Sequence, residues 1–229
     1  EFFPAFGAPD FSTEISRLQG LQPDVILSTS WGGDLDTFVQ QASQRGLMNS
    51  STFVLPLAES SLQRLGSALP AGQIVGARGD HYFLHPERRD DEDFQSFMQQ
   101  YEEATGDVTV YSVFHASQAL AALEAVYTKA IEENGVDWPT EEQLLAAMNG
   151  LEFQGLGLPV TIREDNQGIE SQLMGTSVQA GEHPFATLEN IMIFDGAALT
   201  APVGEVSTDW IKTLDSSFVD GVEVTTFEN

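Results

Sequence analysis

The residues best suited to chemistry in this sequence form a short run, Trp31, Gly32 and Gly33. An indole ring can cover an apolar or a cationic part of a ligand. Glycine has no side chain, so the two glycines would let a ligand approach the backbone. This combination predicts one wall of a small-molecule site. A core tryptophan followed by a turn into the next helix is the alternative interpretation.

A second group of candidate side chains contains His81, His85 and Glu87. The His-x-x-x-His spacing resembles that of metal ligands. On an extended segment, however, four steps of ~3.3 Å would separate the two histidines by roughly 12 Å. No metal site is therefore predicted.

Signatures of catalysis are missing from the sequence. It contains no G-x-S-x-G nucleophile elbow, no P-loop, no G-x-G-x-x-G fingerprint and no H-E-x-x-H motif. It contains no cysteine, which excludes disulfides, zinc–thiolate sites and cysteine nucleophiles. We therefore expect no enzyme, no catalytic residues and no cofactor.

Two consecutive helix–strand units are expected to position the Trp31 run. The apolar pattern predicts helices over residues 10–21 and 35–47, and strands over 25–30, 52–57 and 73–79. Open α/β sheets bind ligands just beyond the carboxyl ends of their strands. Trp31 and the stretch from Leu57 to Ser61 both follow such strand ends, so the pattern predicts the position of a ligand site as well as a fold.

The middle of the chain is predicted to be helical. Helices are expected over residues 60–68, 93–106, 113–135 and 140–148. Asp93 is the expected N-cap of the second of these helices, and Thr140 opens a capping box at the last. The third is apolar on more than one face, which predicts burial between neighbours and makes His115 a core histidine. From Leu151 onward short β-segments follow, with a hairpin turn at residues 164–168.

The charge of the chain is strongly negative. It has 35 acidic and nine basic residues, a formal net charge of −26. This charge argues against nucleic acid and anionic membrane surfaces as partners. The acids are spread from end to end, which favours a halophilic protein whose self-repulsion is screened by salt. An ordinary acidic secreted protein is the alternative.

The order of several motifs resembles a known family. D-F-S-x-x-I-x-R-L at residues 10–18, P-D-V-I at 23–26, F-x-x-x-Y at 97–101 and the run 144–168 resemble the periplasmic ligand-binding proteins of branched-chain amino acid and amide ABC transporters. This is the leucine-binding-protein-like, type I group. The resemblance covers the chain from Phe3 to about Thr213.

The resemblance implies a two-lobed α/β fold of parallel sheets flanked by helices. Three chain crossovers would join the lobes, and hinge closure would enclose a ligand between them. The resemblance also implies that the N-terminal part of a full member is missing. Residues 1–76 and 165–229 would form a partial C-terminal lobe, and residues 77–164 part of the N-terminal lobe with the last crossover.

The resemblance also implies ligand-binding residues. Trp31, with Gly32 and Gly33, matches the position where family members place an aromatic ring against the ligand. His81 and Tyr82 lie near the crossover, where members often present polar or aromatic side chains to the cleft.

Leu57 falls where amino-acid-binding members of the family carry an acid for the ligand ammonium group. Glu59, two residues further on, could replace that acid, or it could be one more exposed acid in an acid-rich chain. A mostly apolar or aromatic acid, or an amide, fits Leu57 at least as well as leucine or valine.

The expected function is therefore extracytoplasmic solute binding for an ABC transporter. The expected partners are a small amino acid, amide or related acid and the transporter permease, with the protein a monomer that a missing N-terminus could anchor to lipid. The alternatives are the sensor domain of a receptor with the same fold and, more weakly, an α/β enzyme.

Overall fold

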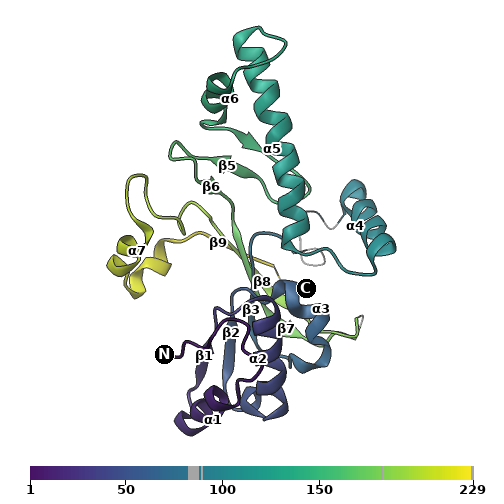
Figure 1. Ribbon diagram of the computed structural model, residues 1–229, viewed down its shortest axis with the longest axis vertical. Coiled ribbons are helices and arrows are strands. Elements are labelled where there is room, and N and C mark those ends of the chain that lie inside the picture. The colour runs from purple at the N-terminus through teal and green to yellow at the C-terminus, as the bar shows by residue number, and fades with distance from the viewer. Residues whose placement is uncertain (82–87, 89, 182, 228–229) are drawn as a thin grey trace. The chain divides into compact units, whose positions relative to one another are not determined.

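The computed structural model describes residues 1–81, 88, 90–181 and 183–227 (Figure 1). It divides into two compact units. The first comprises residues 1–111, 173–192 and 226–229, and the second comprises residues 112–172 and 193–225. The lobe boundaries expected from the sequence concern the complete two-lobed protein and stay a prediction.

The first unit is built on a mixed sheet. Its elements are α1 (Ser12–Leu21), β1 (Val25–Leu27), α2 (Gly32–Gln44), β2 (Thr52–Leu55), α3 (Leu62–Leu65), β3 (Ile74–Ala77), α4 (Glu92–Thr105), β7 (Gln172–Val178) and β8 (Thr187–Phe194), the last two continuing into the second unit. The strand order of the sheet is β1-β2-β3-β7-β8-β9, with β9 at Val224–Phe227. Strands β1 to β3 are parallel, whereas β7 runs antiparallel to β3.

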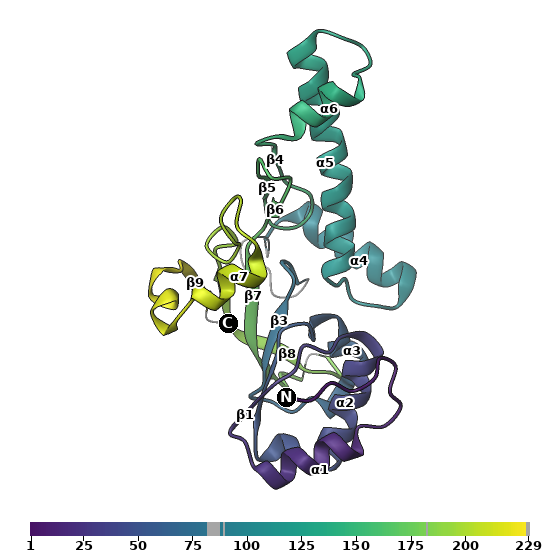
Figure 2. The same cartoon turned by 60° about the vertical axis from the view of Figure 1, so that its left-hand side comes forward.

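Helix α2 anchors the core of the first unit. Its buried positions Leu35, Phe38, Val39 and Ala42 recur at helical spacing. The ring of Phe38 lies 5.8 Å from that of Phe53 on β2, so this face of α2 packs on the sheet. Helix α3 lies on the same side of the sheet as α2 (Figure 2). Each large apolar side chain buried here contributes about 1.5–3 kcal/mol to stability.

The parallel register brings three strand ends together. Ile26 on β1 is paired with Phe53 on β2, and Val54 on β2 with Ile74 on β3. The segments that follow the three strands therefore leave the same edge of the sheet. Gly76 is required at this edge, because a Cβ there would lie 2.6 Å from the carbonyl oxygen of Pro56.

The second unit combines helices with a small sheet. It contains most of α5 (Tyr111–Asn134), with α6 (Glu141–Met148), β4 (Glu152–Phe153), β5 (Val160–Ile162), β6 (Gly168–Ile169) and α7 (Ser207–Trp210). Val126 and Ala130 of α5 pack with Ala147 and Leu151 in its core. The predicted hairpin is confirmed: β5 and β6 are antiparallel, and Asn166 in their turn has φ 63°.

Several helix predictions are confirmed and others are wrong. The capping box is present: Thr140 accepts a hydrogen bond from the Gln143 N–H, and the Gln143 side chain accepts one from the Thr140 N–H. The N-cap of α4, however, is Asp91 and not Asp93, because the Asp91 carboxylate accepts a hydrogen bond from the Phe94 N–H. The predicted helix 60–68 is broken into α3 flanked by two 3₁₀ turns.

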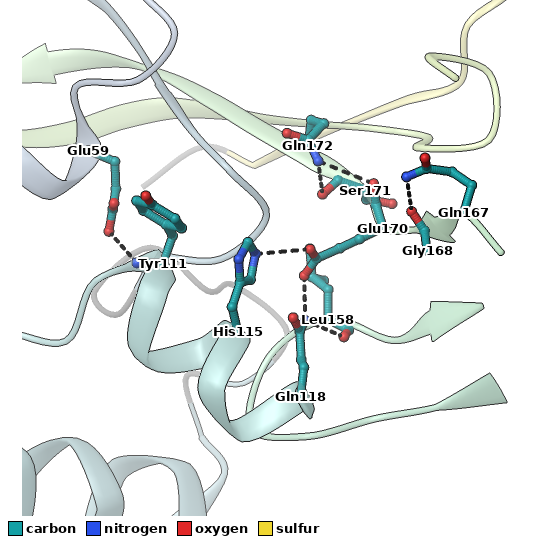
Figure 3. Close-up of polar contacts among 10 residues, drawn as sticks. All are labelled: Glu59, Tyr111, His115, Gln118, Leu158, Gln167, Gly168, Glu170, Ser171 and Gln172. Atoms are coloured by element: carbon teal, nitrogen blue, oxygen red, sulfur yellow. Dashed lines mark hydrogen bonds and ion pairs between the residues drawn. The ribbon is translucent and has the colours of Figure 1, made fainter. Parts of the chain in front are cut away.

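Helix α5 is not buried on all sides. Leu120 is 70% exposed and Leu123 54% exposed, because only the face toward the core of the second unit is covered. His115 is correspondingly not a core histidine. Its side chain is 39% exposed, and its Nε2 lies 3.3 Å from a carboxylate oxygen of Glu170, which also accepts a hydrogen bond from Gln118 (Figure 3).

Among the described residues, no helix is both long enough and apolar enough to cross a membrane.

Candidate functional site

A cavity of about 440 Å³ opens at the strand ends of the first unit. Its volume is in the range of small-molecule sites, roughly 300–1,000 Å³. Its walls come from β3, from the segments after β1, β2 and β3, and from the first residue of α5. The lining residues are Thr29, Trp31, Leu57, Glu59, Ser60, Gly76, Arg78 and Tyr111.

Trp31 lies at the N-terminal end of α2 and lines the cavity. Its side chain is 60% exposed, so the alternative interpretation as a core tryptophan is wrong. Trp31 is the N-cap of α2 in an extended conformation, and Gly32 follows with φ 56°, a conformation that favours glycine. A Cβ at Gly32 or Gly33 would meet no atom within 4 Å, so the space beside Trp31 is open.

Glu59 is buried, contrary to its interpretation as one more exposed acid. Only 2% of the residue is exposed. One carboxyl oxygen accepts a hydrogen bond from the Tyr111 N–H at 3.1 Å (Figure 3), and the other has no hydrogen-bond partner among the described residues. Burial raises the pKa of Glu59 to about 8, with a smaller raising effect from Asp80 that opposes the lowering by the Tyr111 bond. At neutral pH this carboxyl group is therefore mostly protonated.

His81 is buried next to Glu59 and is not among the described residues that line the cavity. His81 is 1% exposed, and its Nε2 is 3.6 Å from the nearer carboxyl oxygen of Glu59. Burial lowers the pKa of His81 to about 3. Because the interior disfavours both charges, the two side chains face each other as neutral groups and not as an ion pair.

Arg78 and Tyr111 form the remaining polar wall. Arg78 follows β3 directly and is exposed, and its guanidinium lies 6.0 Å from the centre of the Tyr111 ring. A cation at this distance from an aromatic face is weakly attracted to it. The cavity thus combines two aromatic rings, a half-buried leucine, a neutral carboxyl group and one permanent positive charge.

A family model described as periplasmic binding protein matches residues 1–182 of this chain. The chain belongs to the periplasmic binding protein family. This confirms the resemblance drawn from the motifs, and the α/β fold with a parallel-rich sheet flanked by helices is confirmed with it. No curated protein matches the chain.

Solved structures with the same fold include several solute-binding proteins. An amino acid ABC transporter substrate-binding protein of Pseudomonas fluorescens Pf-5 has 18% identity and a TM-score of 0.62, covering 83% of this chain and 50% of that one. A leucine-, isoleucine-, valine-, threonine- and alanine-binding protein of Brucella ovis has 17% identity and a TM-score of 0.63, covering 88% and 51%. A solute-binding protein of R. palustris in complex with benzoate has 16% identity and a TM-score of 0.58, covering 81% and 47%.

This periplasmic binding protein chain spans about half the length of those solved structures. At such identities the likeness shows the fold alone. The family and these relatives are binding proteins, which agrees with the expectation that the chain is not an enzyme.

The structure brings together some of the predicted site residues of this binding protein. Trp31, Leu57 and Glu59 line one cavity, whereas Gly32 and Gly33 shape the start of α2. Tyr82, with His85 and Glu87, lies outside the described residues. Within the described part of the chain, no group of three or more His, Asp or Glu side chains is arranged to hold a metal ion.

Five lining residues were not among the predicted site residues, namely Thr29, Ser60, Gly76, Arg78 and Tyr111, although Ser60 lies in the stretch 57–61 that was predicted to be at the strand ends. Gly76 and Arg78 carried a usable signal, because the strand-end rule that identified Trp31 applies equally to the strand predicted at residues 73–79. Tyr111 carried none of its own, since it reaches Glu59 across 52 positions of sequence.

Proposed function

We propose that this chain is the ligand-binding part of an extracytoplasmic solute-binding protein that serves an ABC transporter. The observation that carries the proposal is the cavity itself, where an exposed tryptophan and a buried carboxyl group meet at the strand ends of a periplasmic binding protein. In the complete protein the ligand would be held between two lobes by hinge closure, with Trp31 as one wall. The closed complex would then deliver the ligand to the permease, with the binding protein acting as a monomer.

The proposed ligand is a small amino acid, an amide, or an aromatic or aliphatic acid. Names of relatives support this range, since one is an amino acid transporter protein and another was solved with benzoate. Leu57 and Trp31 offer apolar contact, and we retain Gly32, Gly33, Glu59, His81 and Tyr82 as proposed contributors to the site. Glu59 would do so as a neutral group, and His81 by positioning Glu59.

Intrinsic tryptophan fluorescence and melting temperature of the full-length protein test this proposal. Amino acids, amides and aromatic acids would be screened in molar KCl, and at least one class should change both readouts. Trp31→Phe should abolish the fluorescence change. Trp138→Phe should preserve it, because Trp138 is 77% exposed and packs on Tyr127 in the second unit. If no compound changes either readout, the proposal is wrong.

A further inference from the structure

Of the cavity-lining residues that the structure describes, Arg78 alone has a permanent charge. It makes no hydrogen bond or ion pair with any residue that the structure describes, and its guanidinium lies 6.0 Å from the centre of the Tyr111 ring. Its guanidinium N–H groups are therefore available to donate hydrogen bonds to a ligand in this cavity.

In a chain of net charge −26, the position of Arg78 distinguishes it more than its lack of an ion pair does. Arg17 and Arg45 also make no ion pair with a described carboxylate, but neither of them lines the cavity. Arg64 pairs with Asp36 at 2.7 Å, Arg88 with Asp91 at 2.7 Å, and Arg163 with Asp165. With 35 acids against nine bases, carboxylate partners are abundant. An arginine kept apart from all described carboxylates, at a cavity wall, is thus available for an acidic group that comes from outside the chain.

The surroundings of Arg78 favour an anion. Among the described lining residues the only acid is Glu59, which burial keeps mostly protonated at neutral pH, so this part of the wall carries no opposing negative charge. Trp31 lies at the N-terminus of α2, a 13-residue helix whose positive dipole end adds to the field. A guanidinium binds a carboxylate through two parallel hydrogen bonds, which makes such a contact strong and specific.

We propose that Arg78 recognises a carboxylate on the ligand, so that this site takes an acid with an aromatic or apolar body in preference to a neutral amide or a zwitterionic amino acid. The aromatic rings of Trp31 and Tyr111 and the Leu57 side chain would contact that body. This inference rests on the proposed function and names its substrate class. An ammonium group would meet Arg78 as a like charge and would find no ionised carboxylate in the described lining.

Isothermal titration calorimetry of the full-length protein tests the proposal with matched acid and amide probes. The pairs are benzoate with benzamide, phenylacetate with phenylacetamide, and 4-methylpentanoate with its amide, with leucine and phenylalanine added. In wild-type protein at least one acid should bind about tenfold to a hundredfold more tightly than its amide. Arg78→Gln should remove that preference. Arg78→Lys should keep part of it, since lysine retains the positive charge but lacks the planar guanidinium that donates two parallel hydrogen bonds.

Arg17→Gln is the matched control, because the Arg17 guanidinium also lies over an aromatic ring, that of Phe2 at 4.7 Å, but does not line the cavity. It should leave the acid preference unchanged. Equal affinity for acid and amide in wild type, or an equal loss of both in Arg78→Gln, would overturn the role of Arg78. Binding of amino acids or amides without acids would overturn it while leaving the proposed function intact. If neither these probes nor any compound in the fluorescence screen binds, both the role of Arg78 and the proposed function are refuted.

Discussion

Replacing the buried Glu59 by glutamine should change how the stability of this protein depends on pH. The pKa of Glu59 is about 8 in the folded protein and 4.5 in the unfolded chain, because burial disfavours the charged form. Between these values the folded protein holds a proton that the unfolded chain has released. The stabilisation is complete below pH 4.5 and is lost as the pH rises through about 8. Glutamine stays neutral and has no such loss.

The size of the effect follows from the two pKa values. Each pH unit between them changes the free energy of unfolding by about 1.4 kcal/mol, so the whole interval corresponds to ~5 kcal/mol. Relaxation and water entry from the adjacent cavity reduce this figure. We expect the Glu59→Gln protein to gain about 2–3 kcal/mol relative to wild type between pH 5 and pH 8. The contribution of His81 to stability has the opposite pH dependence. Because its pKa is lowered in the fold, the contribution is complete above pH 6.5 and is lost as the pH falls toward 3. His81 is present in both proteins, so it does not cause a difference between them.

Urea unfolding of the full-length protein at pH 5, 6, 7 and 8, in one KCl concentration, measures this difference. Glu102→Gln is the matched control, because Glu102 is an exposed glutamate on α4 of the same unit. Its stability should follow the wild-type profile at every pH.

Parallel profiles for wild type and Glu59→Gln would refute the reasoning, since they would mean that Glu59 has the same charge in both states. A difference of opposite sign would refute it as well, because a carboxyl group kept protonated in the fold cannot make wild type gain stability over Glu59→Gln as the pH rises.

Three further predictions concern the cavity and the charge. Trp31→Ala should weaken ligand binding at least about tenfold in calorimetry while changing the free energy of unfolding by under about 0.5 kcal/mol, because the side chain is 60% exposed; a large loss of stability would contradict this. Gly76→Ala should destabilise the protein by about 1–3 kcal/mol in urea unfolding, because its Cβ would lie 2.6 Å from the Pro56 oxygen, whereas Gly33→Ala should be tolerated. The melting temperature should rise between 0.1 and 3 M KCl, as salt screens the net charge of −26, and an unchanged value would argue against salt adaptation.

Local patterns were enough to predict many of the elements. The capping box at Thr140 and the hairpin turn between β5 and β6 depend on residues close in sequence, and both predictions are confirmed. The N-cap of α4 was placed two residues late because Asp91 and Asp93 fit the pattern equally well. Only the hydrogen bond from the Phe94 N–H to Asp91 distinguishes them.

The burial of α5 could not be predicted from its composition. Apolar residues on several faces show that a helix can be covered, but which faces are covered depends on its neighbours. Leu120 and Leu123 are exposed in this chain, while Val126 and Ala130 are packed.

The alternation of helix and strand was enough to predict where the cavity wall begins, since it places Trp31 and the segment after Leu57 at the carboxyl ends of parallel strands. What that wall can bind depends on contacts that form only in the folded chain. The tertiary structure buries Glu59 against the N–H of Tyr111, so that the carboxyl group stays protonated, and it places Arg78 at the cavity apart from every described carboxylate. The physical reason is that a charge state depends on desolvation and on neighbours distant in sequence, which no local pattern of residues encodes.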